Sequence, residues 1–310
     1  MTPGAGAPVA AIDCGTNSVR LLVAAGPAQA PVELERTLRI TRLGQGVDAT
    51  GEFHPDALAR TFAACDEYAA VLAAHGVGRL RFVATSAARD AGNREEFFAG
   101  VRARLGVDPE VISGAEEAQL SFDGALGASP EATPPALVVD IGGGSTELVL
   151  GASGQPVRGT SLDIGSVRLR ERFLASDPPT AEQVAAATAH VDALLDASGI
   201  DLAAARTWIG VGGTATSLSA IVQGLETYDR ARVHGSTVTR ADLTALADRL
   251  LGSTVAEVLI IPTMVPGRAD VICAGALICA RVAARVGVDL TVSESDILDG
   301  VVAQLLAAAP

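Results

Sequence analysis

The sequence predicts an α/β protein of two related domains, each with a mixed sheet flanked by helices. The first observation is an internal repeat: IDCGTNSVRLLV (residues 12–23) aligns without gaps to VDIGGGSTELVL (residues 139–150). Each copy predicts two strands joined by a polar turn. After each copy comes a third strand-like segment, and then helical and strand-like segments alternate. A length of 310 residues suits two domains of ordinary size.

In the first half, residues 1–127, each expected element has a local signal. Partial alternation of apolar and polar residues predicts a third strand over 33–44, and apolar positions at helical spacing predict a helix over 55–76. The remaining expected elements are a strand (80–86), a helix (93–106), a short strand (109–114) and a helix (115–127).

The second half, residues 128–310, repeats this order after a linker. ASPEATPP (128–135) has the composition of a loop. The expected elements are a hairpin (136–151), a third strand near 156–163, helices over about 166–198, a strand (206–213), a helix from Thr214, a looser stretch (223–238), further helices, a strand (288–293) and a terminal helix (296–310). We expect the terminal helix to pack back on the first domain.

Composition excludes several classes of protein. The balance of 23 Lys+Arg against 36 Asp+Glu gives a net charge of −13, so we expect no broad basic surface for nucleic acid. No apolar stretch reaches the ~20 residues of a membrane-spanning helix. The start has no signal-peptide pattern, and the four scattered cysteines fit a reducing compartment. These observations predict a cytoplasmic protein without a membrane or nucleic-acid partner.

The first polar turn, DCGTNS, contains residues suited to binding an anion. A glycine and short polar side chains let backbone N–H groups converge, and Thr16, Asn17 and Ser18 add donors. Arg20 follows on the next strand, and its guanidinium is suited to phosphate. Taken alone, this turn is equally explained as an ordinary hairpin turn.

The second turn, DIGGGSTE, combines three glycines with two carboxylates. Gly142, Gly143 and Gly144 allow the backbone to approach a phosphate closely. Asp140 and Glu147 cannot bind phosphate directly, but they can hold a divalent cation that neutralises phosphate oxygens. At the end of another strand, Ser86 and Arg89 are further candidate phosphate contacts, because strand ends in open α/β sheets face ligand sites.

The ordered motifs DxGTNSxR, ATSAxR, SGxEEA, DIGGGSTE, GGT and RAD resemble those of the exopolyphosphatase/guanosine pentaphosphate phosphohydrolase (Ppx/GppA) family, from Ile12 to about Ile278. The resemblance implies two actin-like (ribonuclease H-like) domains with five-stranded sheets and an active site in the interdomain cleft. It also implies a catalytic base at Glu117, with Glu116 as the alternative. Without the other motifs, these glutamates would only complement a helix dipole.

The same resemblance extends the set of candidate site residues. Ser145 and Thr146 join the second phosphate turn, Gly213 and Thr214 are expected to contact a further phosphate, and Asp13, aligned with Asp140, is a third candidate metal ligand. Gly213 and Thr214 are also compatible with a simple strand-to-helix turn. The terminal segment departs from the family, with Ile-Leu-Asp-Gly (297–300) where Leu-Arg-Glu-Gly is usual.

The sequence therefore predicts a hydrolase that uses Mg²⁺ or Mn²⁺ to release orthophosphate from the end of inorganic polyphosphate. Within the family, the alternative substrate is guanosine pentaphosphate (pppGpp), and no residue separates the two. An alternative from another class is an ATP-binding protein of the actin/Hsp70 type without polyphosphatase activity. The short chain, which ends before the helical regions of longer family members, favours a homodimer.

Overall fold

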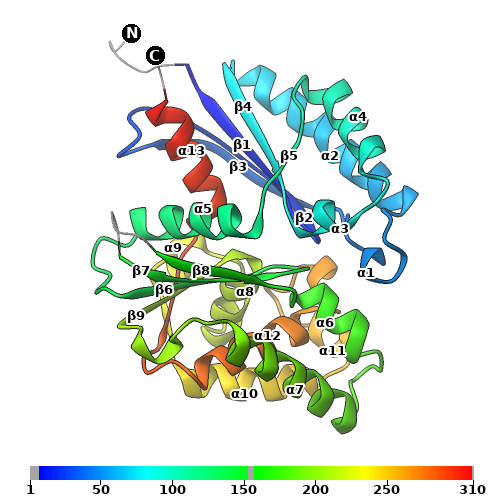
Figure 1. The fold of residues 1–310 in the computed structure, drawn as a ribbon, viewed down its shortest axis with the longest axis vertical. Coiled ribbons are helices and arrows are strands. Elements are labelled where there is room, and N and C mark those ends of the chain that lie inside the picture. The colour runs from blue at the N-terminus through cyan, green and yellow to red at the C-terminus, as the bar shows by residue number, and fades with distance from the viewer. Residues whose placement is uncertain (1–6, 153–156, 309–310) are drawn as a thin grey trace. The chain divides into compact units, whose positions relative to one another are not determined.

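The computed structural model describes residues 7–152 and 157–308 (Figure 1). The chain forms two compact units, and unit 1 consists of Met1–Gly127 with Ile297–Pro310. Unit 2 consists of Ala128–Asp296. The terminal helix thus belongs to the same unit as the N-terminal half.

The sheet of unit 1 has five strands in the order β3-β2-β1-β4-β5. β1 pairs antiparallel with β2 and parallel with β4, β5 continues the parallel side, and β3 pairs antiparallel with β2. The strands are β1 (Val9–Cys14), β2 (Ser18–Ala25), β3 (Val32–Ile40), β4 (Arg79–Ala84) and β5 (Glu110–Val111). Every residue of β1 is buried, as expected for the central strand of a sheet covered on both faces.

Helices cover the sheet of unit 1. They are α1 (Val47–Thr50), α2 (Pro55–Ala74), α3 (Ser86–Asp90), α4 (Arg94–Leu105), α5 (Gly114–Gly127) and α13 (Ile297–Ala307). α13 packs chiefly against α5 and β1. Gly300 permits this close packing, because a Cβ atom there would lie 2.2 Å from the carbonyl oxygen of Leu120 on α5. The last two residues of the predicted 296–310 helix lie outside the described residues.

Unit 2 has a sheet of six strands in the order β10-β11-β9-β6-β7-β8. They are β6 (Ala136–Ile141), β7 (Thr146–Gly151), β8 (Arg158–Leu162), β9 (Thr207–Val211), β10 (Thr237–Val238) and β11 (Leu290–Val292). The prediction of five strands was one short, because β10 lies in the stretch expected to be loose. A two-residue strand is too short to show alternation in the sequence. Residue 156, where the third strand was expected to begin, lies outside the described residues.

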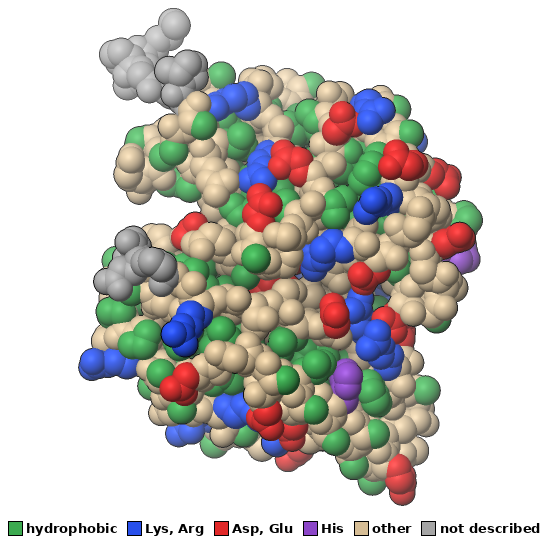
Figure 2. Space-filling model, viewed as in Figure 1, with side chains coloured by type: hydrophobic (Ala, Val, Ile, Leu, Met, Phe, Trp, Pro, Cys, Tyr) green, Lys and Arg blue, Asp and Glu red, His purple; other side chains and the backbone are tan. Residues whose placement is uncertain are grey.

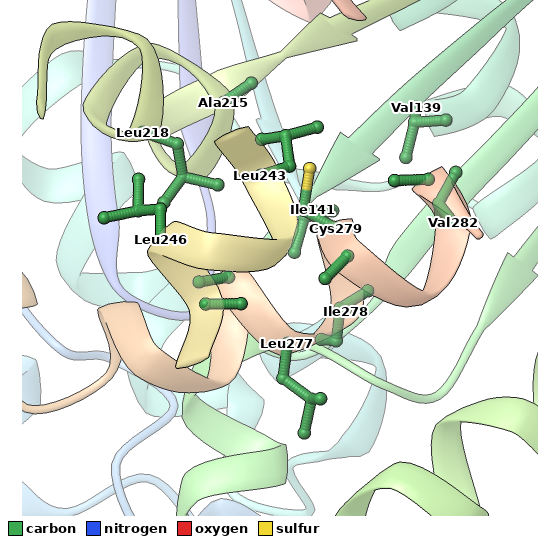
Figure 3. Packing of buried hydrophobic residues seen from close by; sticks show 14 of the residues in the cluster. Val139, Ile141, Ala215, Leu218, Leu243, Leu246, Leu277, Ile278, Cys279 and Val282 are labelled. Carbon is green, nitrogen blue, oxygen red and sulfur yellow. The ribbon is translucent and has the colours of Figure 1, made fainter. Parts of the chain in front are cut away.

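The helices of unit 2 enclose a large apolar core. They are α6 (Ser166–Phe173), α7 (Ala181–Ala197), α8 (Gly212–Val222), α9 (Arg230–Val233), α10 (Arg240–Leu251), α11 (Val255–Leu259) and α12 (Ile272–Ala283), with short 3₁₀ turns η1 (Leu202–Ala204) and η2 (Pro266–Arg268). Figure 3 shows α8, α10 and α12 contributing Leu218, Leu246 and Ile278 to this core, beside Val139 and Ile141 of β6. Cys279 also lies there as a buried free thiol.

The two units repeat one strand order. β1, β2 and β3 correspond to β6, β7 and β8, while β4 and β5 correspond to β9 and β11, which are also parallel to their neighbours. The predicted class, two related α/β units with mixed sheets, is confirmed. In both units the repeated polar turn follows the carboxyl end of the first strand, the edge where α/β sheets bind ligands.

Surface charge is mixed on the face that Figure 2 shows, where acidic and basic side chains are interspersed. In the part of the chain that the structure describes, no helix is both long enough and apolar enough to cross a bilayer.

Candidate functional site

The turn of unit 1 places an acid and a base directly opposite one another. Asp13 on β1 pairs with Arg20 on β2 in the antiparallel register. The guanidinium donates to the carboxylate of Asp13 from Nε at 3.0 Å and from Nη2 at 2.6 Å. This geometry forms an ion pair between Asp13 and Arg20, and the role of Asp13 as a metal ligand stays a prediction.

Backbone N–H groups from a later segment hold the carbonyl groups of this turn. The carbonyl of Asn17 accepts from the N–H groups of Thr41 (3.1 Å) and Arg42 (3.0 Å), and the carbonyl of Thr16 accepts from Gly44 (2.8 Å). Arg42 has a φ of 52°, a left-handed conformation that costs a non-glycine residue ~1–2 kcal/mol. Because the carbonyls face this segment, the planar peptide groups direct their N–H atoms the opposite way, where an anion can bind.

The two candidate glutamates of α5 have different surroundings. Glu117 is nearly buried, with an 11% exposed side chain, and its carboxylate accepts from Arg89 at 2.8 Å. Glu116 has a 45% exposed side chain and accepts from Arg81 at 2.7 Å. Arg89 also donates to the carbonyl of Ile112, so this guanidinium fixes Glu117 relative to the end of β5. The structure brings Glu117 and Arg89 together and leaves Glu116 in a surface ion pair.

Ser86 lies where β4 ends and α3 begins, and it is buried. β4 is the parallel neighbour of β1, and the N–H of Thr85 donates to the carbonyl of Cys14 at 3.2 Å. Ser86 and the polar turn of unit 1 therefore lie at the same edge of the sheet.

The turn of unit 2 places two acids where unit 1 has an acid and a base. Asp140 on β6 pairs directly with Glu147 on β7, and their exposed fractions are only 9% and 2%. Two buried carboxylates on opposed positions repel one another unless a cation or a proton compensates. The hydroxyl of Ser161 on β8 donates to Oε1 of Glu147 at 2.7 Å.

The start of α6 holds the glycine turn from behind. The carbonyl of Gly142 accepts from the N–H of Ser166 (2.8 Å), and the carbonyl of Gly143 accepts from the N–H groups of Val167 (2.9 Å) and Arg168 (3.1 Å). Within the described parts of the chain, the N–H groups of Gly143 and Gly144 donate no backbone hydrogen bond. They are thus available to a phosphate, as in other glycine-rich phosphate-binding turns.

The segments beside this turn are held by hydroxyl groups of Thr146 and Thr214 and by a close contact at Gly213. The hydroxyl of Thr146 donates to the carbonyl of Ile164 at 2.6 Å, and that of Thr214 donates to the carbonyl of Ile141 at 2.8 Å. The guanidinium of Arg268 lies against Gly213, where a Cβ atom would be 2.4 Å from Nη2. Both threonine hydroxyl protons are used inside the fold, so a phosphate would be bound here by backbone groups.

Gly212 allows the β9–α8 turn to pass beside Asp140. Its φ is 76°, and a Cβ atom would lie 2.5 Å from Oδ1 of Asp140. The carboxylate therefore needs a glycine at this position.

The residues of unit 2 fit a Mg²⁺ or Mn²⁺ ion bound largely by its substrate. Among the described residues there is no cluster of three or more His, Cys, Asp or Glu side chains that could hold a metal by themselves. Mg²⁺ is commonly bound by one or two carboxylates together with water and substrate phosphates. The buried pair Asp140 and Glu147 supplies that number of carboxylates.

Cys14, next to Asp13, is not a nucleophile at neutral pH. Burial raises the pKa of its thiol well above the ordinary value, and Cys65 and Asp13 raise it further. Burial likewise raises the pKa of Cys65 to about 12. Both thiols therefore stay protonated near neutral pH.

Several supporting residues were missed by the sequence reasoning. Gly44 and Gly165 each permit the close approach that holds a turn: a Cβ atom would lie 2.3 Å from Cγ2 of Thr16 in the first case and 2.4 Å from the carbonyl of Gly143 in the second. Ser161 was also missed. The repeat itself offered a signal, because a glycine follows the third strand in each half.

The comparisons with known proteins identify the family. The model of the Ppx/GppA phosphatase family matches residues 22–307. The chain belongs to this family. As a member of a phosphatase family it is a hydrolase.

Three similar proteins match over nearly their full length. Exopolyphosphatase 2 of Mycobacterium tuberculosis is 50% identical over 313 residues, covering 96% of this chain and 98% of the relative. A crystal structure of an exopolyphosphatase-like protein has a TM-score of 0.92 at 44% identity, covering 96% of this chain and 97% of that one. The Ppx/GppA family member of Aquifex aeolicus has a TM-score of 0.80 at 32% identity, with 97% of each chain covered.

Proposed function

We propose that this Ppx/GppA phosphatase is an exopolyphosphatase that uses Mg²⁺ or Mn²⁺ to hydrolyse the terminal phosphoanhydride of inorganic polyphosphate. One observation carries the proposal. The same opposed positions hold Asp13 and Arg20 in unit 1 but Asp140 and Glu147 in unit 2. The first turn thus pairs its acid with an arginine, whereas the second presents two opposed carboxylates, the number of carboxylates that commonly binds a divalent cation. The relatives named as exopolyphosphatases support polyphosphate as the substrate.

In this proposal, a water oxygen attacks the terminal phosphorus while the bond to the bridging oxygen breaks. Glu117 accepts the proton of the water, and the leaving phosphate keeps the bonding electrons. Arg89 holds the carboxylate of Glu117 in place through its 2.8 Å hydrogen bond. In unit 1, Arg20 would stabilise negative charge on phosphate oxygens, and in unit 2 the N–H groups of Gly143 and Gly144 would stabilise such charge.

The cation would be held by Asp140 and Glu147, and when bound it supplies positive charge to phosphate oxygens. Backbone N–H groups of Thr16, Asn17, Ser18, Ser145 and the turn before Thr214 remain proposed phosphate contacts, as does Ser86. Because polyphosphate carries many phosphates, a substrate of this kind can supply a ligand to each of these groups.

The test is phosphate release by purified protein from polyphosphate and from pppGpp, with Mg²⁺, with Mn²⁺ and with a chelator. We expect faster release from polyphosphate, loss of release with the chelator, and loss in Glu117→Gln. If the wild-type rate on polyphosphate is no higher than that of Glu117→Gln, the proposal is wrong. Faster release from pppGpp would identify the alternative substrate, whereas tight ATP binding without turnover of either would favour an actin/Hsp70-type protein.

A further inference from the structure

Ser161 hydrogen-bonds one of the two buried carboxylates of unit 2. It lies on β8 directly opposite Glu147 of β7 in the antiparallel register. Its hydroxyl donates to Oε1 of Glu147 at 2.7 Å, within the usual range for a strong O–H···O bond. Glu147 is 2% exposed, so water does not replace this donor easily.

The equivalent position of the third strand in unit 1 can be compared with Ser161. Arg20 of β2 corresponds to Glu147, and the residue opposite Arg20 on the third strand is Leu38. At this position of the third strand, a hydroxyl therefore stands in the unit whose opposed pair is two carboxylates. Where the pair is Asp13 and Arg20, an apolar side chain occupies that place.

The hydrogen bond fixes the rotation of the Glu147 carboxylate about its last torsion, which is otherwise soft. Groups that orient a metal ligand in this way commonly change metal affinity about 10–100-fold when they are removed.

We infer that Ser161 is a positioning residue for divalent-cation binding, acting through the carboxylate of Glu147. The inference rests on the proposed cation site at Asp140 and Glu147. It assigns Ser161 a role in cation affinity and none in contact with the reacting phosphate.

The experiment measures Mn²⁺ binding by electron paramagnetic resonance and, separately, the Mg²⁺ concentration that half-activates phosphate release. Ser161→Ala should weaken Mn²⁺ binding about 10–100-fold. Ser161→Thr, which keeps the hydroxyl and suits a strand, should retain most of the affinity. Ser161→Cys keeps the side-chain size with a much weaker donor and should resemble Ser161→Ala, so the inference stays testable if alanine unfolds the strand.

Thr160→Ala is the matched control. Thr160 is the neighbouring residue of β8, lies opposite Leu148 and points to the other face of the sheet. It should leave Mn²⁺ affinity unchanged. Thermal unfolding with and without Mn²⁺ separates the roles, because a purely structural serine would lower the melting temperature without reducing the stabilisation that Mn²⁺ adds.

The outcomes distinguish this inference from the proposed function. If wild type binds Mn²⁺, Glu147→Gln does not, and Ser161→Ala binds as well as wild type, the inference is wrong and the cation site stands. If wild type neither binds Mn²⁺ nor loses activity with a chelator, the cation site itself is wrong.

Discussion

Gly165→Ala should displace the glycine turn of unit 2 from behind. A Cβ atom at Gly165 would lie 2.4 Å from the carbonyl carbon and oxygen of Gly143 and 2.5 Å from the nitrogen of Gly144. All three are backbone atoms, so no flexible side chain can move aside. Ordinary van der Waals contact begins at about 3.5 Å, and the turn or the start of α6 must therefore shift by about 1 Å.

The size of the effect follows from that shift. Forcing an extra methyl group into a packed site typically costs about 1–3 kcal/mol of unfolding free energy. A displacement of about 1 Å at groups that position a substrate can lower the rate about 100-fold. The hydrogen bonds from Ser166, Val167 and Arg168 would lengthen with the shift, and the N–H groups of Gly143 and Gly144 would no longer point at the phosphate.

The assay is kcat/KM for phosphate release together with chemical denaturation followed by circular dichroism. Gly287→Ala is the control, because nothing lies within 4 Å of a Cβ atom built there. It should leave both activity and stability near wild type. A Gly165→Ala protein with wild-type kcat/KM would refute the view that α6 positions the turn, whatever its stability.

Three further predictions concern charged groups. Glu117→Gln should lower kcat about 10²–10⁴-fold, whereas Glu116→Gln should cost at most about 1 kcal/mol of stability; equal losses of kcat would contradict the assignment. The 23 Lys+Arg residues are all arginines. Acetylation of amines should therefore leave phosphate release unchanged, whereas an arginine-specific reagent should abolish it. Inhibition by acetylation would contradict this prediction. Partial burial raises the pKa of Asp192, but hydrogen bonds from Arg281 and Arg285 lower it overall. Asp192→Asn should therefore lower the free energy of unfolding by about 1 kcal/mol near pH 7, measured by chemical denaturation. The difference from wild type should shrink as the pH falls below about 4. A difference that grows in acid would contradict this prediction.

The hairpins could be predicted because their signal is local. Buried strands flank a short polar turn in both copies, and the gapless alignment of the two copies indicated two related units. Arg20 lies seven positions after Asp13, and Glu147 lies seven positions after Asp140. Because the turn length of a hairpin sets its register, this spacing indicates that each pair lies on opposed positions.

The supporting contacts could not be predicted, because they join segments far apart in the sequence. The choice between Glu117 and Glu116 depends on which arginine forms an ion pair with each glutamate. The sequence does not show whether Arg81 or Arg89 pairs with a given glutamate. The contact of Ser161 with Glu147 depends on the pairing of β8 with β7. The conformation of Arg42 depends on the two N–H groups that converge on Asn17, which no local propensity indicates.

The placement of α13 has a consequence for the order in which the protein folds during its synthesis. Val9 and Ala11 of β1 and Leu120 of α5 are buried in one cluster with Ile297 and Val301 of α13. At about 5–20 residues per second, the ribosome needs roughly 10–30 s to make the residues between α5 and α13. The apolar surface of unit 1 therefore stays without its last helix while the whole of unit 2 is synthesised. A nascent chain halted before residue 297 would expose that surface, and this half of the protein is the one we expect chaperones to bind.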